Sequence, residues 1–142
     1  MDNIIIEKIW DDSDIANNQL FEIKLTCINK YINISQNVYF DNSISKNIAK
    51  KIENYIKTNK ETHYEINMEK GYSTGFAMKI FPYDITGHIL IEMKMEINDN
   101  NEKLHYATFY IKTEIGLLEN FGKKIENIIK LEIGENIKLY NN

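Results

Sequence analysis

The segment Gly87–Gly122 constrains the fold more than any other, because its hydrophobic period changes once along its length. Residues 88–97 (HILIEMKMEI) carry Ile or Met at every second position, and this period of two predicts a strand with one buried face. A turn at Asp99–Asn101 and a second alternating run at residues 106–112 (YATFYIK) follow. Residues 113–130 then carry apolar residues at helical spacing. The segment therefore predicts a β-hairpin that leads directly into an amphipathic helix.

The hairpin can also be given a register. We expect a three-residue loop at Asp99–Asn101, because Asn101 tolerates the left-handed conformation that such a loop needs. A longer loop of odd length in the same register is the alternative. A slip of one residue would move every buried side chain to solvent and is therefore excluded. The predicted pairs are Ile89–Ile111, Ile91–Phe109 and Met93–Ala107 on the buried side, and Glu92–Thr108 and Lys94–Tyr106 on the outer side.

The same periodicity rules divide the rest of the chain. Alternation predicts strands at residues 3–10, 19–28, 31–40 and 72–81, and a short edge strand at residues 137–140. Helical spacing predicts a helix that is capped by Asn42 or Ser43 and ends near Thr58–Asn59. Residues 59–71 are polar and are expected to form a connector. The second helix is expected to use Thr113 as its cap and to stop before Gly134.

These elements define an α+β protein with the order (β)ββαβββα, in which residues 3–10 form the bracketed strand. A chain of 142 residues fits a single domain, so we assign residues 1–142 to one α+β domain. We expect a mostly antiparallel sheet of about five to six strands, with both amphipathic helices on one face. Gly122 lies inside the second helix, where close packing of that helix on the sheet would explain it.

The composition excludes several classes of protein. The net charge is −4, and all 17 basic residues are lysine. Because arginine is the preferred reader of phosphates and guanine edges, we expect no nucleic-acid partner. No apolar run is long enough to span a membrane, and the N-terminus lacks the pattern of a signal peptide, so we expect a cytoplasmic protein without a membrane partner. The single cysteine, Cys27, is in phase with a strand core and is expected to be buried.

Residues that would carry out chemistry are sparse. The three histidines, His63, His88 and His105, lack the spacing of a metal site. No phosphate-binding loop or nucleophile motif is present, so we expect no catalytic residues, no cofactor and no metal, and we predict that the protein is not an enzyme. His105 is in phase with the buried face and is expected to be at least half buried. His88 follows Asp84 closely, and this pair is either a general base or a cap of the turn.

A row of polar and aromatic residues lies opposite the predicted core. Tyrosine offers a large, stiff and amphipathic contact area and is enriched at interfaces, which favours a binding surface. Tyrosine and threonine are also common on any wet sheet face, so a solvated surface is the alternative. The candidate partner-binding residues are Tyr39, Glu92, Lys94, Glu96, Tyr106 and Tyr110.

Three segments carry a family resemblance. They are the hairpin that begins FEIKL, the strand GHILIEMKME and the segment YATFYIKTEIGLLENFGKKI. Over roughly residues 19–130 the chain resembles WapI-type bacterial immunity proteins and related uncharacterised small bacterial α+β families. The resemblance implies a non-catalytic protein that binds and neutralises a cognate bacterial toxin by occlusion, and it transfers no catalytic residues.

Two other functions stay open at this point. The first is a small-molecule-binding module or enzyme, with a pocket between the sheet and the helices near Asp84 and His88. The second is a structural or oligomerisation protein, which would form a homodimer through the outer sheet face.

Overall fold

The computed structural model describes residues 2–12, 20–66, 75–98 and 104–141. Its α+β class agrees with the sequence prediction. The elements, in chain order, are β1 (Asn3–Asp11), β2 (Leu20–Ile28), β3 (Asn33–Asp41), α1 (Asn42–Thr58), β4 (Thr62–Ile66), β5 (Gly75–Pro82), β6 (His88–Asn98), β7 (Leu104–Glu114), α2 (Ile115–Glu126), the 3-10 turn η1 (Ile128–Lys130) and β8 (Asn136–Lys138).

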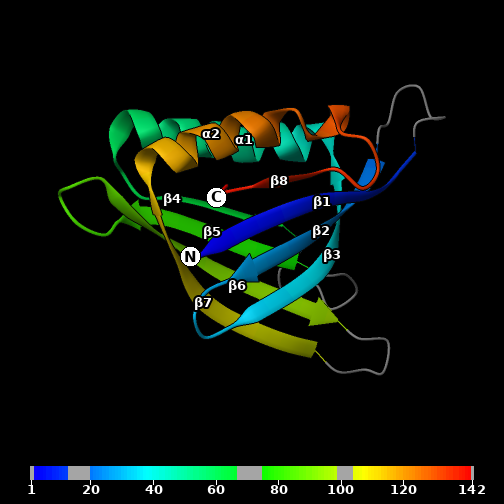
Figure 1. Cartoon of the computed structure of the whole chain (residues 1–142), viewed down its shortest axis with the longest axis horizontal. Coiled ribbons are helices and arrows are strands. Elements are labelled where there is room, and N and C mark those ends of the chain that lie inside the picture. The colour runs from blue at the N-terminus through cyan, green and yellow to red at the C-terminus, as the bar shows by residue number, and fades with distance from the viewer. Residues whose placement is uncertain (1, 13–19, 67–74, 99–103, 142) are drawn as a thin grey trace.

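The strands form two antiparallel sheets of four strands each, and not the single sheet that we expected. Sheet A has the order β3-β2-β1-β8, and sheet B has the order β4-β5-β6-β7. Figure 1 shows β1, β2 and β3 in front of β5, β6 and β7, with both helices along one side of the molecule. The expectation failed because alternation shows which face of a strand is buried but not which strands are neighbours.

One strand was missed altogether. β4 (Thr62–Ile66) lies within the predicted connector and pairs with β5 at the edge of sheet B. Only Ile66 of this strand is fully buried, and its outward residues His63 and Glu65 are exposed. A short edge strand with so few apolar residues gives no alternation signal.

The core lies between the inner faces of the two sheets and beneath the helices. Sheet A contributes the buried side chains of Phe21, Ile23 and Leu25, and sheet B contributes those of Ile91 and Met93. Phe40 of β3 stacks on Phe76 of β5 with their ring centroids 6.2 Å apart, which joins the two sheets directly. Cys27 is buried as expected, and burial raises the pKa of its thiol to about 12.

The β6–β7 register differs from the predicted one by two residues. Each predicted side chain keeps its face, but the opposite partners change because a slip of two residues preserves the inward and outward phases. Asn98 pairs with Leu104, and the predicted turn Asp99–Asn101 lies outside the described residues. The observed pairs include Ile89–Thr113, Ile91–Ile111, Met93–Phe109, Glu92–Tyr110 and Lys94–Thr108.

Both helices begin with a different residue from the predicted cap. In α1 the cap is Asp41, whose Oδ1 accepts a hydrogen bond from the Ile44 amide at 2.8 Å. In α2 the N-cap is Glu114, which makes no side-chain cap bond, and Thr113 is the buried penultimate residue of β7. The helix axis therefore starts where the strand ends, without an intervening loop.

Gly122 marks a helix–helix contact rather than a helix–sheet contact. A Cβ atom added to Gly122 would lie 2.8 Å from Cγ2 of Ile52 on α1, closer than two carbon atoms can pack. The absence of a side chain at this position therefore lets α1 and α2 approach each other closely across the helix layer.

Candidate partner-binding surfaces

The six predicted partner-binding residues do not form one surface. Glu92, Lys94 and Glu96 lie on β6, and Tyr106 and Tyr110 lie on β7, all in the outward phase of sheet B. The sixth residue, Tyr39, lies on β3 in sheet A and therefore belongs to a different face of the molecule. Alternation correctly predicted that Tyr39 lies on an outer face. The expectation of a single sheet wrongly put it beside the residues of β6 and β7.

Four of these residues form what we call the sheet-B patch: Glu92, Lys94, Tyr106 and Tyr110. The Tyr110 hydroxyl donates a hydrogen bond to Glu92 Oε2 at 3.0 Å. Glu92 Oε1 lies 3.9 Å from Lys79 Nζ and 4.0 Å from Lys94 Nζ. The hydrogen bond to the Glu92 carboxylate, with its negative charge, raises the pKa of Tyr110. The Glu92 carboxylate therefore already has three neighbours, Tyr110, Lys79 and Lys94.

Glu96 does not belong to this patch. We expected Glu96 on an exposed face, but this residue is 0% exposed. Its neighbour on β5 is Gly75, and Ala77, the next outward residue of β5, is also buried. On this part of the outer face Glu96 and its β5 neighbours are therefore buried, whereas Tyr106, which pairs with Glu96 on β7, is exposed.

His105 also differs from its expectation, because it is exposed rather than half buried. Along β7 the inward residues Phe109 and Ile111 are buried, Ala107 is partly buried and His105 is exposed. Burial therefore decreases toward the start of this edge strand, which an alternating pattern cannot indicate.

Tyr39 has a partner that sequence reasoning missed, Trp10. The two rings meet edge to face with centroids 6.4 Å apart and an interplanar angle of 86°. Trp10 pairs with Glu22 across β1 and β2, and Glu22 pairs with Tyr39 across β2 and β3. These three residues form a row across three adjacent strands on the outer face of sheet A. We call Trp10, Glu22 and Tyr39 the sheet-A row.

A β-bulge puts Trp10 into this row. Lys8 pairs with Ile23, but Trp10 already pairs with Glu22, so β1 contains one extra residue at this point. Unbroken alternation would give Trp10 the inward phase of Ile6 and Lys8. The bulge reverses the phase and turns Trp10 outward, where 41% of its surface is exposed.

The buried Lys8 side chain holds the bulged end of β1. Its Nζ donates to the backbone carbonyls of Ile129 and Leu131, each at 3.0 Å, and lies 3.0 Å from Asp11 Oδ2. It also lies 5.2 Å from the ring centroid of Phe21. Because Lys8 is only 2% exposed, these contacts compensate for the loss of water around its charge. They tie sheet A to the segment that follows α2.

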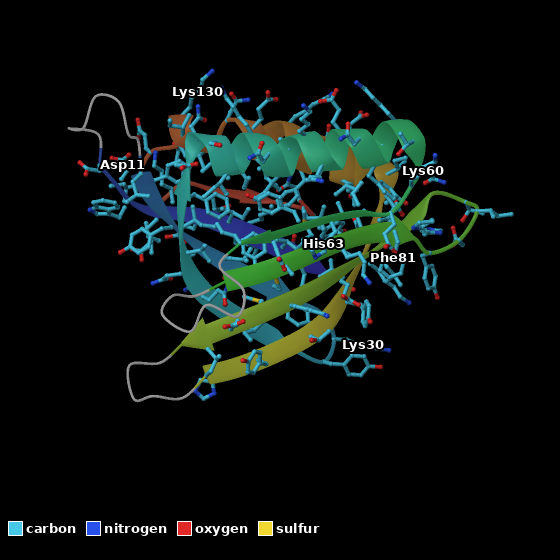
Figure 2. The ribbon with its side chains drawn as sticks, turned by 180° about the vertical axis from the view of Figure 1, so that it is seen from behind. Asp11, Lys30, Lys60, His63, Phe81 and Lys130 are labelled. Carbon is cyan, nitrogen blue, oxygen red and sulfur yellow. The ribbon has the colours of Figure 1, made fainter. Side chains whose placement is uncertain are left out.

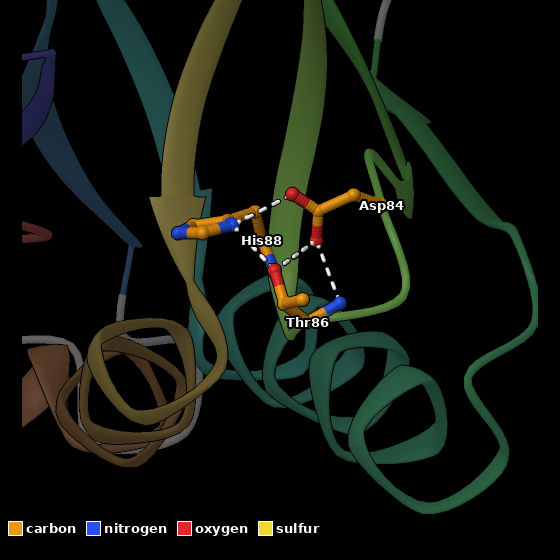
Figure 3. Close-up of polar contacts among 3 residues, drawn as sticks. All are labelled: Asp84, Thr86 and His88. Atoms are coloured by element: carbon orange, nitrogen blue, oxygen red, sulfur yellow. Dashed lines mark hydrogen bonds and ion pairs between the residues drawn. The ribbon is translucent and has the colours of Figure 1, made fainter.

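The Asp84–His88 pair lies in the turn between β5 and β6 (Figure 3). Asp84 Oδ2 lies 2.7 Å from His88 Nδ1, and Asp84 Oδ1 accepts hydrogen bonds from the amide and hydroxyl of Thr86 at 2.8 and 2.7 Å. The Thr86 hydroxyl and amide, with a smaller contribution from His88, hold the pKa of Asp84 well below its usual range. The carboxylate of Asp84 therefore caps the turn, which is one of the two roles predicted for this pair from the sequence.

A small pocket of about 190 Å³ lies beside His88. Lys112, Glu114, Leu117 and Tyr140 are among its walls. This volume is below the range of about 300–1,000 Å³ that is usual for small-molecule sites. In the described ranges, no group of three or more His, Cys, Asp or Glu side chains is arranged to hold a metal ion.

An open groove of about 690 Å³ lies between α1 and α2, and neither Asp84 nor His88 lines it. Ile52 and Gly122 lie along it, and its polar lining carries both signs of charge. These charged residues are Lys46, Lys50, Lys57, Lys123, Glu53, Glu119 and Glu126. Two ion pairs lie in this lining, each within a single helix. Lys57 Nζ lies 2.7 Å from Glu53 Oε1 on α1, and Lys123 Nζ lies 3.9 Å from Glu119 Oε1 on α2, so much of this charge is already compensated.

No protein-family model and no curated protein matches this chain. Among solved structures, the plant transcriptional regulator PBF-2 is similar, with a TM-score of 0.49 and 9% identity over 92% of this chain and 78% of that one. WHY3 from Arabidopsis thaliana is similar with a TM-score of 0.49 and 9% identity, over 91% and 82% of the two chains. None of the described helices is long and apolar enough to cross a membrane.

Proposed function

We propose that this chain is a non-catalytic binding protein that neutralises a cognate bacterial toxin by occlusion in the cytoplasm. The family resemblance of the sequence suggests this role. The observation that carries the proposal is the exposure of aromatic side chains beside carboxylates on the outer faces of both sheets. Tyr106 is 66% exposed, Tyr110 45% and Tyr39 54%, so all three rings are open to a partner.

The sheet-B patch has the properties of a preorganised interface. The hydrogen bond from Tyr110 to Glu92 fixes the ring and the carboxylate before a partner arrives, which lowers the entropy lost on binding. Tyr106 lies on the outward face of β7, next to Thr108, and supplies an exposed aromatic side chain as an anchor. Lys94 supplies a charge at the rim. Occlusion needs only such a surface placed over the toxin's active site, and no group that performs chemistry.

Co-expression with the protein product of the neighbouring gene tests this function. We expect the chain to co-purify with that product and to restore growth of cells that express it. The double variant Tyr106→Ala, Tyr110→Ala is expected to weaken both effects, and Tyr31→Ala, which removes a tyrosine exposed to 83% in the β2–β3 turn, serves as the matched control. A chain that neither binds the product nor restores growth contradicts the proposal.

A second candidate function is an enzyme or small-molecule-binding module at the Asp84–His88 turn. One observation favours it: Asp84 holds His88 through Nδ1, an arrangement that directs Nε2 outward as a base. The variant His88→Gln separates the two functions in the same growth assay. Loss of rescue by a folded His88→Gln protein favours chemistry, and unchanged rescue favours binding by the sheet faces.

A further inference from the structure

We infer that the sheet-A row, formed by Trp10, Glu22 and Tyr39, holds the side chain of an arginine from a basic segment of a protein partner. The inference names the chemistry of the partner, and it rests on the proposed function only in taking that partner to be a protein. It concerns a different face from the sheet-B patch, so the two surfaces can be tested separately.

The geometry places two aromatic rings beside one carboxylate. Trp10 and Tyr39 lie on strands that flank β2, so their backbones are about 10 Å apart. Their ring centroids are nevertheless only 6.4 Å apart, so both rings lean toward each other across the position of Glu22. Trp10 is 41% exposed and Tyr39 is 54% exposed, which leaves ring surface open to a partner.

Glu22 is the uncompensated member of this row. Within the described part of the chain it has no ion pair and no side-chain hydrogen bond, and its cross-strand neighbours are both aromatic. Partial burial between two rings reduces its contact with water. A guanidinium group satisfies both features together, because it donates two parallel hydrogen bonds to a carboxylate and stacks its plane on an aromatic ring.

The surroundings favour a basic segment rather than a phosphate backbone. Leu20, which pairs with Asp41, is the next outward residue of β2, and the Asp12 amide bonds the Leu20 carbonyl at 3.0 Å. Further along the same face Glu7 pairs with Lys24, so these two charges balance and Glu22 gives this part of the face its negative charge. Leu20 is 41% exposed and extends the apolar contact. Like-charge repulsion disfavours nucleic acid on such a surface, and charge complementarity favours lysine- and arginine-rich protein.

The composition indicates that the arginine comes from another protein. This chain contains no arginine, so neither its own segments nor a second copy can supply a guanidinium. A lysine of a second copy would bring a compact ammonium, which neither pairs bidentately nor stacks in the same way.

Fluorescence reports on this row directly, because Trp10 is the single tryptophan of the chain. The probe is a short peptide of alternating arginine and glycine, with a matched peptide in which citrulline replaces each arginine. We expect a saturable change in Trp10 emission with the arginine peptide and none with the citrulline peptide. Glu22→Gln is expected to weaken binding about tenfold or more, because the hydrogen bonds from the guanidinium group lose their charged acceptor. The matched control Glu65→Gln, at an exposed glutamate of β4 outside both surfaces, is expected to leave the affinity unchanged.

Several outcomes contradict the inference. Equal affinity of the Glu22→Gln and parent chains for the arginine peptide overturns it, as does tighter binding of a single-stranded oligonucleotide than of the peptide. A lysine peptide that binds as tightly as the arginine peptide removes the guanidinium argument. Thermal unfolding of each variant confirms that it is folded, and Tyr39→Leu, which retains Trp10 as reporter, is a second variant expected to weaken binding.

The same variants keep this inference distinct from the proposed function. If the neighbouring gene's product binds the Glu22→Gln chain as well as the parent and the arginine peptide does not bind, the arginine site is wrong and the proposed function stands. If the peptide binds as expected but the gene product does not bind the chain, the proposed function is wrong and the arginine site stands.

Discussion

The outer faces of the two sheets carry similar residues in different states. On sheet B, the Glu92 carboxylate accepts a hydrogen bond from Tyr110 and has two lysines within about 4 Å. On sheet A, Glu22 lies between Trp10 and Tyr39 without a polar partner among the described side chains. Each face therefore presents carboxylate and aromatic groups, but only one of the two carboxylates is compensated within the chain.

The difference shows that residue type alone does not identify a binding site. A carboxylate that is already hydrogen-bonded and ion-paired within the chain gives a binding surface its shape and rigidity. A partner gains little binding free energy there, because its bonds only replace existing ones. An uncompensated carboxylate beside aromatic rings is the group that gains most from a partner of opposite charge. We therefore expect sheet A to determine the chemistry of the partner and sheet B to contribute contact area.

The largest effect on stability is expected from removal of the Lys8 contacts, which hold the bulged end of β1 beside the sheet-A row. Lys8→Ala removes a buried cation and leaves Asp11 and two carbonyls without their partner. We expect the free energy of unfolding to fall by about 3 kcal/mol or more, as for other broken buried pairs. Urea denaturation measures this loss. Lys24→Ala, an exposed lysine of the same sheet, is the control and is expected to change stability by less than about 0.5 kcal/mol. An equal loss in both variants would show that the Lys8 contacts are not responsible.

A smaller effect is expected in the helix layer, which both sheets share. Gly122→Ala places a methyl group 2.8 Å from Ile52 Cγ2, and we expect it to lower the free energy of unfolding by about 1–2 kcal/mol. Gly116→Ala in the same helix meets no atom within 4 Å and is expected to be neutral or to stabilise the chain by up to about 1 kcal/mol. The emission of Trp10 should stay unchanged in both variants. A shift in that emission would mean that the outer face of sheet A depends on helix packing.

The smallest expected effect concerns the Tyr110–Glu92 bond and depends on pH. The pKa of Tyr110 is raised in the folded chain, so its stabilising contribution is present at neutral pH and disappears as pH rises through that raised value. We expect Tyr110→Phe to lower the urea midpoint slightly at pH 7 and to match the parent once the pH exceeds the raised pKa of Tyr110. Tyr39→Phe removes a hydroxyl without a hydrogen bond in the described structure and should have no such effect. A Tyr110→Phe deficit that persists at high pH would contradict the role of this bond.

Sequence periodicity predicted the faces of the strands but not their neighbours. Ile89, Ile91 and Met93 are buried as expected, and the exposed phase of Lys94, Tyr106 and Tyr110 is also confirmed. The division into two sheets and the two-residue shift of the hairpin could not be predicted, because both leave every side chain in the same phase.

The sheet-A row was missed for a different physical reason. Its key residue, Trp10, follows a bulge, and a single extra residue reverses the phase of everything after it. The sequence around Lys8 and Ile9 contains no glycine or proline that would mark the bulge. The side chain and backbone of Lys8 bond to the segment after α2 at this point, and such tertiary contacts leave no local signal in the sequence.

Collisional quenching of Trp10 by acrylamide tests the central claim most directly, namely that the bulge turns this residue onto the outer face of sheet A. The single tryptophan makes the measurement unambiguous. An indole that is 41% exposed should be quenched readily in the native chain, at a rate that approaches that of the urea-unfolded chain. A native tryptophan that is protected from acrylamide and emits at short wavelength would show that Trp10 is in the core, in phase with Ile6 and Lys8, and would contradict the account.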